Sequence, residues 1–165
     1  MKRFLCILLS IVMVSVLLGC SSRGVDPVSF YYCRESDSYQ YFDMEGVISS
    51  EPRDLTEHRG NLKYILGLYL AGPIEEGLVS PFPRNVQLQS VTSAEGTLQI
   101  ELSDLGTSMS DAQFSLACAC LTLTCTDVSS YREVTVISGS RNLTMNADSL
   151  LLYDDVSAEQ PTNGG

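Results

Sequence analysis

The sequence contains few of the residues on which enzymes and nucleic-acid-binding proteins depend. Its 165 residues include no tryptophan and a single histidine, His58. Lysine and arginine together number 10 against 20 aspartates and glutamates, which gives a formal net charge of −10 at pH 7. Because a surface that binds nucleic acid must be positively charged, we expect no nucleic-acid partner.

The motifs of common enzyme classes are also missing. The chain has no G-x-S-x-G nucleophile elbow, no H-E-x-x-H zinc motif, no P-loop and no dinucleotide-binding fingerprint. His58 lies at the polar start of an expected helix, and we interpret it as a solvated residue. We therefore expect no enzymatic activity and no cofactor. Adjacent acids at Glu75–Glu76 and Asp154–Asp155 leave a cell-wall-modifying enzyme, or its accessory subunit, as the alternative function.

The first apolar run of the chain is too short for a typical membrane-spanning helix. Lys2 and Arg3 precede 15 residues, Phe4–Leu18, that are apolar except for two serines. A spanning helix needs about 20 residues, whereas a basic start and a short apolar run that ends at a small residue are typical of a secretory signal. We therefore predict a cleaved signal peptide over residues 1–19.

The signal ends in Leu17-Leu18-Gly19-Cys20, which resembles the bacterial lipobox. In that motif the cysteine thiol is acylated with diacylglycerol, and the signal is cut just before the cysteine. The resemblance implies that Cys20 is the lipidation site and attaches the protein to the lipid bilayer through a tether over residues 20–27. The predicted location is the bacterial cell membrane, facing outside the cytoplasm. An ordinary signal peptide with an incidental cysteine is the alternative.

Four more cysteines follow Cys20. They are Cys33, Cys118, Cys120 and Cys125. A Cys-x-Cys-x4-Cys run with one distant cysteine is one form of zinc site, but such runs favour loops and this one lies in a helical pattern, so we expect no metal. Free or partly oxidised core thiols are the preferred interpretation, and a disulfide from Cys33 to one of the other three stays open.

Hydrophobic periodicity predicts two helices among several short strands. Thr56 is the expected N-cap of a helix over Glu57–Leu70, which Ala71-Gly72-Pro73 ends. Ser110 and Gln113 are the expected capping box of a second helix that runs to about Thr124. The expected strands are Val28–Cys33, a ragged segment at Tyr39–Ile48, Val86–Thr92, Leu98–Leu102, Arg132–Ile137, Arg141–Met145 and an edge at Leu150–Tyr153, with a loop over Ser49–Asp54. This order predicts an α+β fold, a small and mostly antiparallel sheet with two helices packed on one face.

Several motifs follow one another in a fixed order and carry a family resemblance. They are the first helix with Gly72-Pro73, the segment Ser80-Pro81-Phe82-Pro83, the hairpin strands Val86–Val91 and Leu98–Ser103, and the second helix with its following strand. Together they resemble one copy of the GerMN domain, which is named for a sporulation and spore-germination lipoprotein. We delimit this domain as residues 28–156, followed by a disordered tail over 157–165. The resemblance implies a non-enzymatic domain that binds or assembles with envelope proteins, with a role in sporulation or germination.

Both expected helices carry apolar residues outside their main buried stripe. On the second helix Leu116, Cys120 and Leu123 lie opposite that stripe, and on the first helix Tyr64 and Leu68 lie behind it. Because an exposed apolar patch usually marks a binding partner, these five residues are candidates for an interface with an envelope protein or with a second copy. The alternative is that loops, the ragged strand or the last edge strand cover them.

Overall fold

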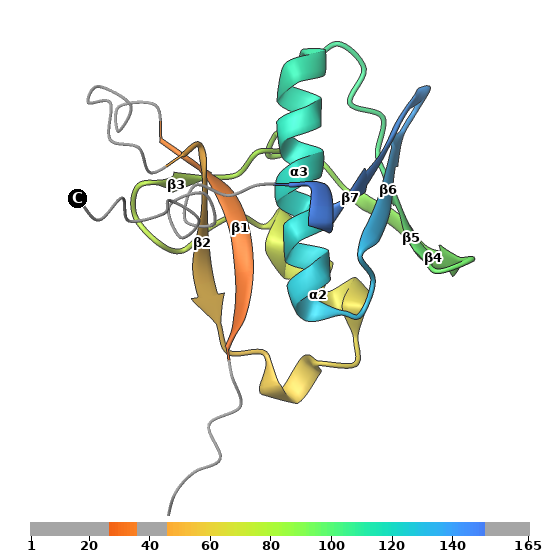
Figure 1. Ribbon diagram of the computed structural model, residues 1–165. Coiled ribbons are helices and arrows are strands. Elements are labelled where there is room, and N and C mark those ends of the chain that lie inside the picture. The colour runs from red at the N-terminus through yellow and green to blue at the C-terminus, as the bar shows by residue number, and fades with distance from the viewer. Residues whose placement is uncertain (1–26, 36–45, 151–165) are drawn as a thin grey trace, which may run out of the picture.

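The computed structural model of the chain describes residues 27–35 and 46–150 (Figure 1). The strands are β1 (Val28–Arg34), β2 (Ile48–Arg53), β3 (Leu78–Val79), β4 (Leu88–Ala94), β5 (Thr97–Leu102), β6 (Glu133–Ser138) and β7 (Arg141–Asn146). The helices are α2 (Leu62–Leu70) and α3 (Asp111–Val128), and 3-10 turns cover Thr56–His58 and Ala147–Ser149. The predicted α+β fold class is confirmed.

The strands form two sheets. The first sheet has the order β2-β1-β3, and all its pairs are antiparallel. The second sheet has the order β4-β5-β6-β7, in which β5 and β6 run parallel and the two outer pairs run antiparallel. Neighbouring parallel strands need a crossover connection, and the segment that contains α3 supplies it between β5 and β6.

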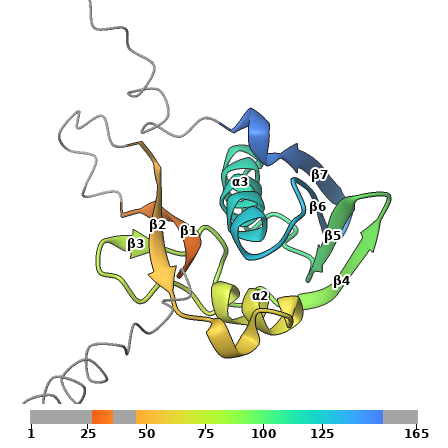
Figure 2. The ribbon, with the colours of Figure 1, turned by 60° about the horizontal axis from the view of Figure 1, so that its bottom comes forward.

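Helix α3 lies between the two sheets, and Figure 2 shows it with β1, β2 and β3 on one side and β5, β6 and β7 on the other. It contacts β1 of the first sheet and both β6 and β7 of the second. Every residue from Ala117 to Cys125 is buried. A helix that is apolar on all sides must be covered on all sides, and the second sheet and β1 provide that cover.

Local signals explain several of the element ends. The predicted capping box of α3 is confirmed, because the Ser110 hydroxyl accepts from the Gln113 backbone N–H and the Gln113 side chain accepts from the Ser110 N–H. The two strands expected to form a hairpin do so, as β4 and β5. The turn residues Glu95 and Gly96 have φ values of 53° and 86°, as the favoured two-residue hairpin turn requires.

Three predicted boundaries are wrong. Residues Ser49–Asp54 were expected to form a loop, but those up to Arg53 belong to β2 and pair with β1. Helix α2 begins at Leu62 rather than Glu57, because the Asn61 side chain caps it by accepting from the Tyr64 backbone N–H. Helix α3 continues past the expected end at Thr124, to Val128.

Parts of the prediction lie outside the described residues. These are the signal peptide and lipidation site, most of the ragged segment Tyr39–Ile48, residues 151–153 of the expected last strand, and the tail. Within residues 27–35 and 46–150, no helix has the length and apolar character needed to cross a membrane.

Candidate interaction surface

The candidate surface is the loop between α2 and β3, residues 71–77, and a buried carboxylate beside it holds it in place. Glu51 of β2 is only 2% exposed. Its side chain accepts hydrogen bonds from Arg53 Nε at 2.6 Å and from the backbone N–H groups of Ile74 at 2.9 Å and Glu75 at 2.8 Å. Arg53 Nη2 adds an ion pair with the same carboxylate. A buried charge is tolerated only when it is paired and hydrogen-bonded, and these donors meet that condition.

Arg53 extends this hydrogen-bond network to Gly72, which precedes Ile74 in the same loop. Its Nη2 donates to the Gly72 carbonyl at 3.3 Å, and its guanidinium carbon lies 5.4 Å from the centre of the Phe30 ring. Three backbone groups of the loop, at Gly72, Ile74 and Glu75, are therefore held by two side chains of one strand. The loop conformation is fixed by the sheet beneath it.

Aromatic packing supports the end of α2, from which the loop emerges. The rings of Tyr32 and Tyr69 stack with centroids 4.9 Å apart and an interplanar angle of 10°. Phe30 and Phe82 meet Tyr69 edge-on at 5.7 Å and 6.5 Å. The Tyr32 hydroxyl donates to the Tyr69 carbonyl at 3.0 Å, and burial raises the pKa of Tyr32, so this hydroxyl remains a donor. The α2 end of the loop thus rests on packed aromatic rings.

The loop presents an apolar side chain to the solvent. Ile74 is 79% exposed, the largest exposed fraction among the large hydrophobic side chains of the described residues. The two acids that follow it, Glu75 and Glu76, are also exposed. The chain then enters β3, where Val79 is 37% exposed. Single exposed apolar residues are common, but here Ile74 is held in one backbone conformation by a buried charged network, which suits a preorganised contact.

The five interface candidates that the sequence predicts differ in their exposure in the structure. Cys120 is fully buried and Leu123 is 9% exposed, which corrects the expectation of an outward-facing second stripe on α3 at these two residues. The physical reason is that β1 packs on α3 on that side. Leu116 is half-buried, and Leu68 is half-buried and packs against the core. Tyr64 is 43% exposed, on the surface of α2.

His58 lies in the 3-10 turn before α2, within a hollow of about 420 Å³ that Asp54 and Thr56 also line. The Thr56 hydroxyl donates to the Asp54 carboxylate at 2.6 Å and so lowers the pKa of Asp54. The His58 ring packs against Tyr64, with centroids 4.2 Å apart. The hydroxyl nearest to the histidine in sequence is thus bound to a carboxylate, and these residues do not form a nucleophile–base pair.

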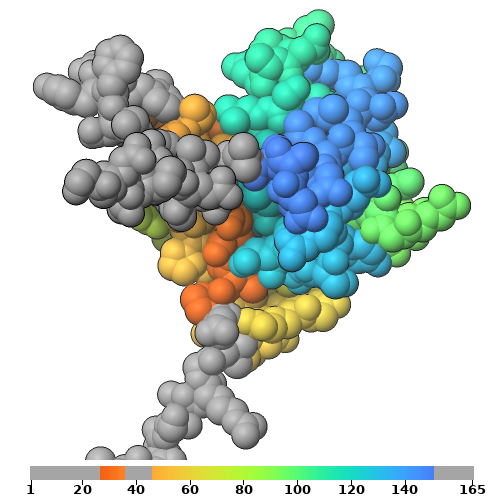
Figure 3. All heavy atoms as spheres, viewed as in Figure 1, coloured from red at the N-terminus to blue at the C-terminus, as the bar shows by residue number. Residues whose placement is uncertain are grey.

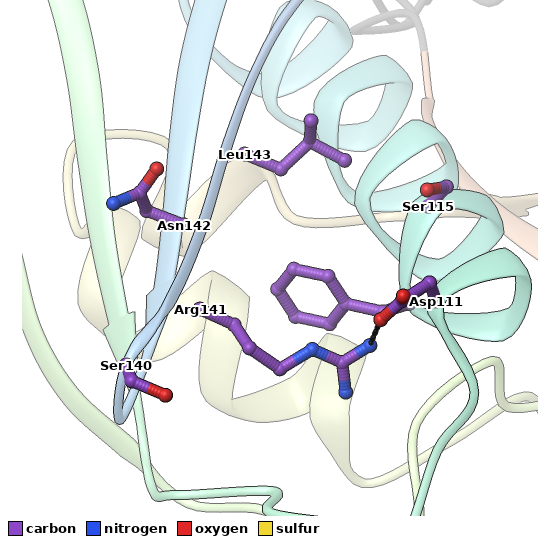
Figure 4. A pocket seen from close by; sticks show the side chains of 7 residues that line it. Asp111, Ser115, Ser140, Arg141, Asn142 and Leu143 are labelled. Atoms are coloured by element: carbon purple, nitrogen blue, oxygen red, sulfur yellow. Dashed lines mark hydrogen bonds and ion pairs between the residues drawn. The ribbon is translucent and has the colours of Figure 1, made fainter.

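A second open pocket, of about 330 Å³, lies between the start of α3 and the start of β7 (Figure 4). Arg141 crosses it with its guanidinium carbon 4.4 Å from the centre of the Phe114 ring, and it donates to the Asp111 carboxylate at 2.8 Å and to the Met109 carbonyl at 3.1 Å. Because the Arg141 guanidinium already binds the Asp111 carboxylate and the Met109 carbonyl, this pocket offers little positive charge to an anionic ligand. Elsewhere in the described ranges, no three histidine, cysteine, aspartate or glutamate side chains gather as metal ligands.

Three comparisons with known proteins bear on the family of this chain. The comparison with curated proteins finds no match. Among solved structures, the tandem GerMN domains of the sporulation protein GerM from Bacillus subtilis match 70% of this chain with 19% identity and a TM-score of 0.46, and the match covers 39% of that chain. The model of the family called Germane, sporulation and spore germination, matches residues 29–143. The resemblance to the GerMN domain is thereby confirmed, and the chain belongs to the sporulation and spore germination family.

Proposed function

We propose that this chain is a lipid-anchored protein of the bacterial envelope, and that its GerMN domain acts by binding another envelope protein rather than by catalysis. Membership of the sporulation and spore germination family supports a role in one of these two processes. The observation that carries the proposal is Ile74, which is 79% exposed on a loop that the buried Glu51 carboxylate holds in place.

The anchor would keep the domain close to the membrane. Cys20 is the proposed acylation site, and β1 begins at Val28. The chain between them spans at most about 27 Å when it is fully extended. Confinement to this layer raises the local concentration of the domain towards any partner that is held in the same membrane.

The chemistry around Ile74 indicates what kind of partner fits. Glu75 and Glu76 directly follow it, and the chain from Cys20 onward has 8 basic and 20 acidic residues, a formal charge of −12. A partner with an apolar socket bordered by lysine or arginine is complementary to this surface. A second copy of the chain would bring acids against acids, so we favour a different protein over self-association.

The proposal is tested with a photo-crosslinking amino acid placed at position 74, or at position 64 as a matched exposed control, in the full chain in its own cells. We expect one discrete adduct from position 74 and none from position 64. Glu75→Lys with Glu76→Lys should abolish that adduct, whereas the exposed pair Ser93→Lys with Thr92→Lys on β4 should not. An adduct from position 74 that survives Glu75→Lys with Glu76→Lys, or an adduct that forms only from position 64, would refute the proposed contact.

Two further measurements separate the parts of the proposal. Cys20→Ala should release the chain from the membrane fraction and remove the incorporation of a labelled fatty acid. The alternative, a wall-modifying enzyme, predicts that the chain clears cell-wall substrate and that Glu75→Gln or Glu76→Gln stops the clearing. That result would overturn the non-enzymatic proposal and leave the anchor intact.

A further inference from the structure

The described part of the chain holds four reduced cysteines, all of them buried. Three lie on α3, at positions 118, 120 and 125, and the fourth, Cys33, lies near the end of β1. None of them takes part in the surface proposed above. The proposed location is outside the cytoplasm, where thiols become oxidised to disulfides. It therefore matters which two of the four sulfurs lie close enough to form a bond.

Strand β1 and helix α3 lie side by side in a fixed register (Figure 1). The backbone N–H of Ser29 donates to the Asp127 carboxylate, and the N–H of Tyr31 donates to the Thr124 hydroxyl at 2.9 Å. Later residues of β1 therefore lie beside earlier residues of α3. Figure 3 shows the surface of this contact, where atoms of the first sheet, in orange, meet atoms of α3 and of the second sheet, in teal to blue.

This register predicts the next pair. Two residues further along an antiparallel strand advance about 6.8 Å, and four residues back along a helix retreat about 6 Å. From the Tyr31–Thr124 pair, these steps lead to Cys33 and Cys120. The two steps are nearly equal in length. Residues 31 and 33 share one face of the strand, and residues 124 and 120 share one face of the helix.

The two sulfurs do meet. The Cys33 and Cys120 thiols hydrogen-bond to each other, which lowers the pKa of Cys33 and, together with burial, raises the pKa of Cys120. Cys33 is the more accessible residue of the pair, at 8% exposed against 0% for Cys120.

The other two thiols point elsewhere. At about 100° per residue, Cys118 lies about 160° and Cys125 about 140° around the helix from Cys120. Burial raises the pKa of Cys118 to about 12, which the nearby Arg141 of the second sheet only partly offsets, and burial also raises the pKa of Cys125. Neither is placed to meet Cys33.

We propose that Cys33 and Cys120 are a disulfide site, oxidised to a covalent link between β1 and α3 in the mature protein, whereas Cys118 and Cys125 remain thiols. This inference rests on the proposed extracytoplasmic location. The oxidant is a disulfide compound or a disulfide-bearing oxidoreductase, which acts by thiol–disulfide exchange. The Cys33 thiolate attacks one sulfur of the oxidant and releases one thiol. Cys120 then loses its proton and displaces the second thiol, so two protein thiols become one disulfide while the oxidant gains two protons and two electrons.

The link would act on the unfolded chain more than on the folded one. Cys33 and Cys120 are 87 positions apart, so the bond closes a loop over more than half of the chain. Closing a loop of this length restricts the unfolded ensemble strongly. We expect the melting temperature of the oxidised protein to exceed that of the reduced protein by about 10 °C or more.

The test has two arms, both on the full chain. In the first, membranes of cells that export the chain are denatured in the presence of a light maleimide, which labels free thiols. The disulfides are then reduced, and the released thiols are labelled with an isotopically heavier maleimide. Mass spectrometry reads the label on each cysteine. In the second, the purified chain is refolded from denaturant in a buffer of reduced and oxidised glutathione and labelled in the same way. Refolding gives the oxidant access to Cys120, which the folded protein buries.

The expected result is the heavy label on Cys33 and Cys120 and the light label on Cys118 and Cys125, in both arms. Cys118→Ser with Cys125→Ser should keep the link and its gain in melting temperature, and Cys33→Ser should lose both without creating another link. Free Cys33 and Cys120 after refolding in glutathione, or a link to Cys118 or Cys125, would overturn the inference. If refolding forms the link but the membrane protein carries free thiols, the disulfide site stands and the extracytoplasmic location fails.

Discussion

Replacement of Glu51 by glutamine is the sharpest test of the network that holds the Ile74 loop. The substitution keeps the size of the side chain and removes its charge. The carboxylate now accepts from Arg53 and from the N–H groups of Ile74 and Glu75. A glutamine has one oxygen and one NH₂ group, so at least one of these donors would face another donor.

The size of the effect follows from what is left behind. Removing one partner of a buried ion pair costs about 3 to 5 kcal/mol, because the other charge remains without compensation. The Arg53 side chain is 17% exposed, against 3% for Glu51, so water can reach the remaining cation in part. This places the expected loss near the lower end, at about 3 kcal/mol, or roughly 10 °C in melting temperature for a chain of this size.

Urea denaturation followed by circular dichroism measures the global loss, and hydrogen exchange measures the local one at the amides of Ile74 and Glu75. Glu101→Gln is the matched control, since Glu101 is exposed and accepts only from the Ser90 hydroxyl among the side chains of the described residues. We expect it to change stability by less than about 0.5 kcal/mol. If Glu51→Gln stays within about 1 kcal/mol of wild type and both loop amides keep their protection, the carboxylate does not hold the loop.

Two more substitutions test other parts of the fold. Thr124→Val removes the acceptor of the Tyr31 N–H, and we expect urea denaturation to show a loss of about 1 to 3 kcal/mol, whereas no loss would contradict the register between β1 and α3. Gly139→Ala adds a side chain at φ 59° that collides with the Asp104 carboxylate, so we expect a loss of about 1 to 3 kcal/mol in thermal melts. Gly60→Ala has no neighbour within 4 Å and should change stability by less than about 1 kcal/mol, and equal effects at the two glycines would refute this explanation.

Features that depend on a few consecutive residues could be predicted from the sequence. The Ser110–Gln113 capping box and the turn at Glu95 and Gly96 satisfy backbone groups that lie within three residues of each other. The order of strands and helices follows from such local signals and from hydrophobic periodicity. These features are enough to give the α+β class, and their order gives the family.

Features that depend on polar contacts between distant residues could not be predicted. The sequence predicts that the second helix ends at about Thr124, but it continues past Asp127, and the Thr124 and Asp127 side chains accept from backbone N–H groups of β1, more than 90 residues away in the sequence. Glu51 lies in a segment, Ser49–Asp54, that the sequence predicts to be a loop. In β2 it lies opposite Phe30 and points inward, where donors from the loop after α2 meet it. Only the pairing of β2 with β1 shows which residues of β2 face the core and which face the solvent.

The same polar contacts explain why β1 is not an open edge. Its pairing with β3 covers only Cys33 and Arg34, so the groups before them on that side need other partners. The Tyr31 N–H and carbonyl find Thr124 and the Tyr69 hydroxyl, and the Ser29 N–H finds Asp127. An uncovered edge strand invites pairing with another chain, and here side chains of two helices occupy it instead. Cys33 lies where the cover changes from α3 to β3, so a bond from Cys33 to Cys120 would fasten the helix to the strand at the point where the helix stops supplying hydrogen bonds to it.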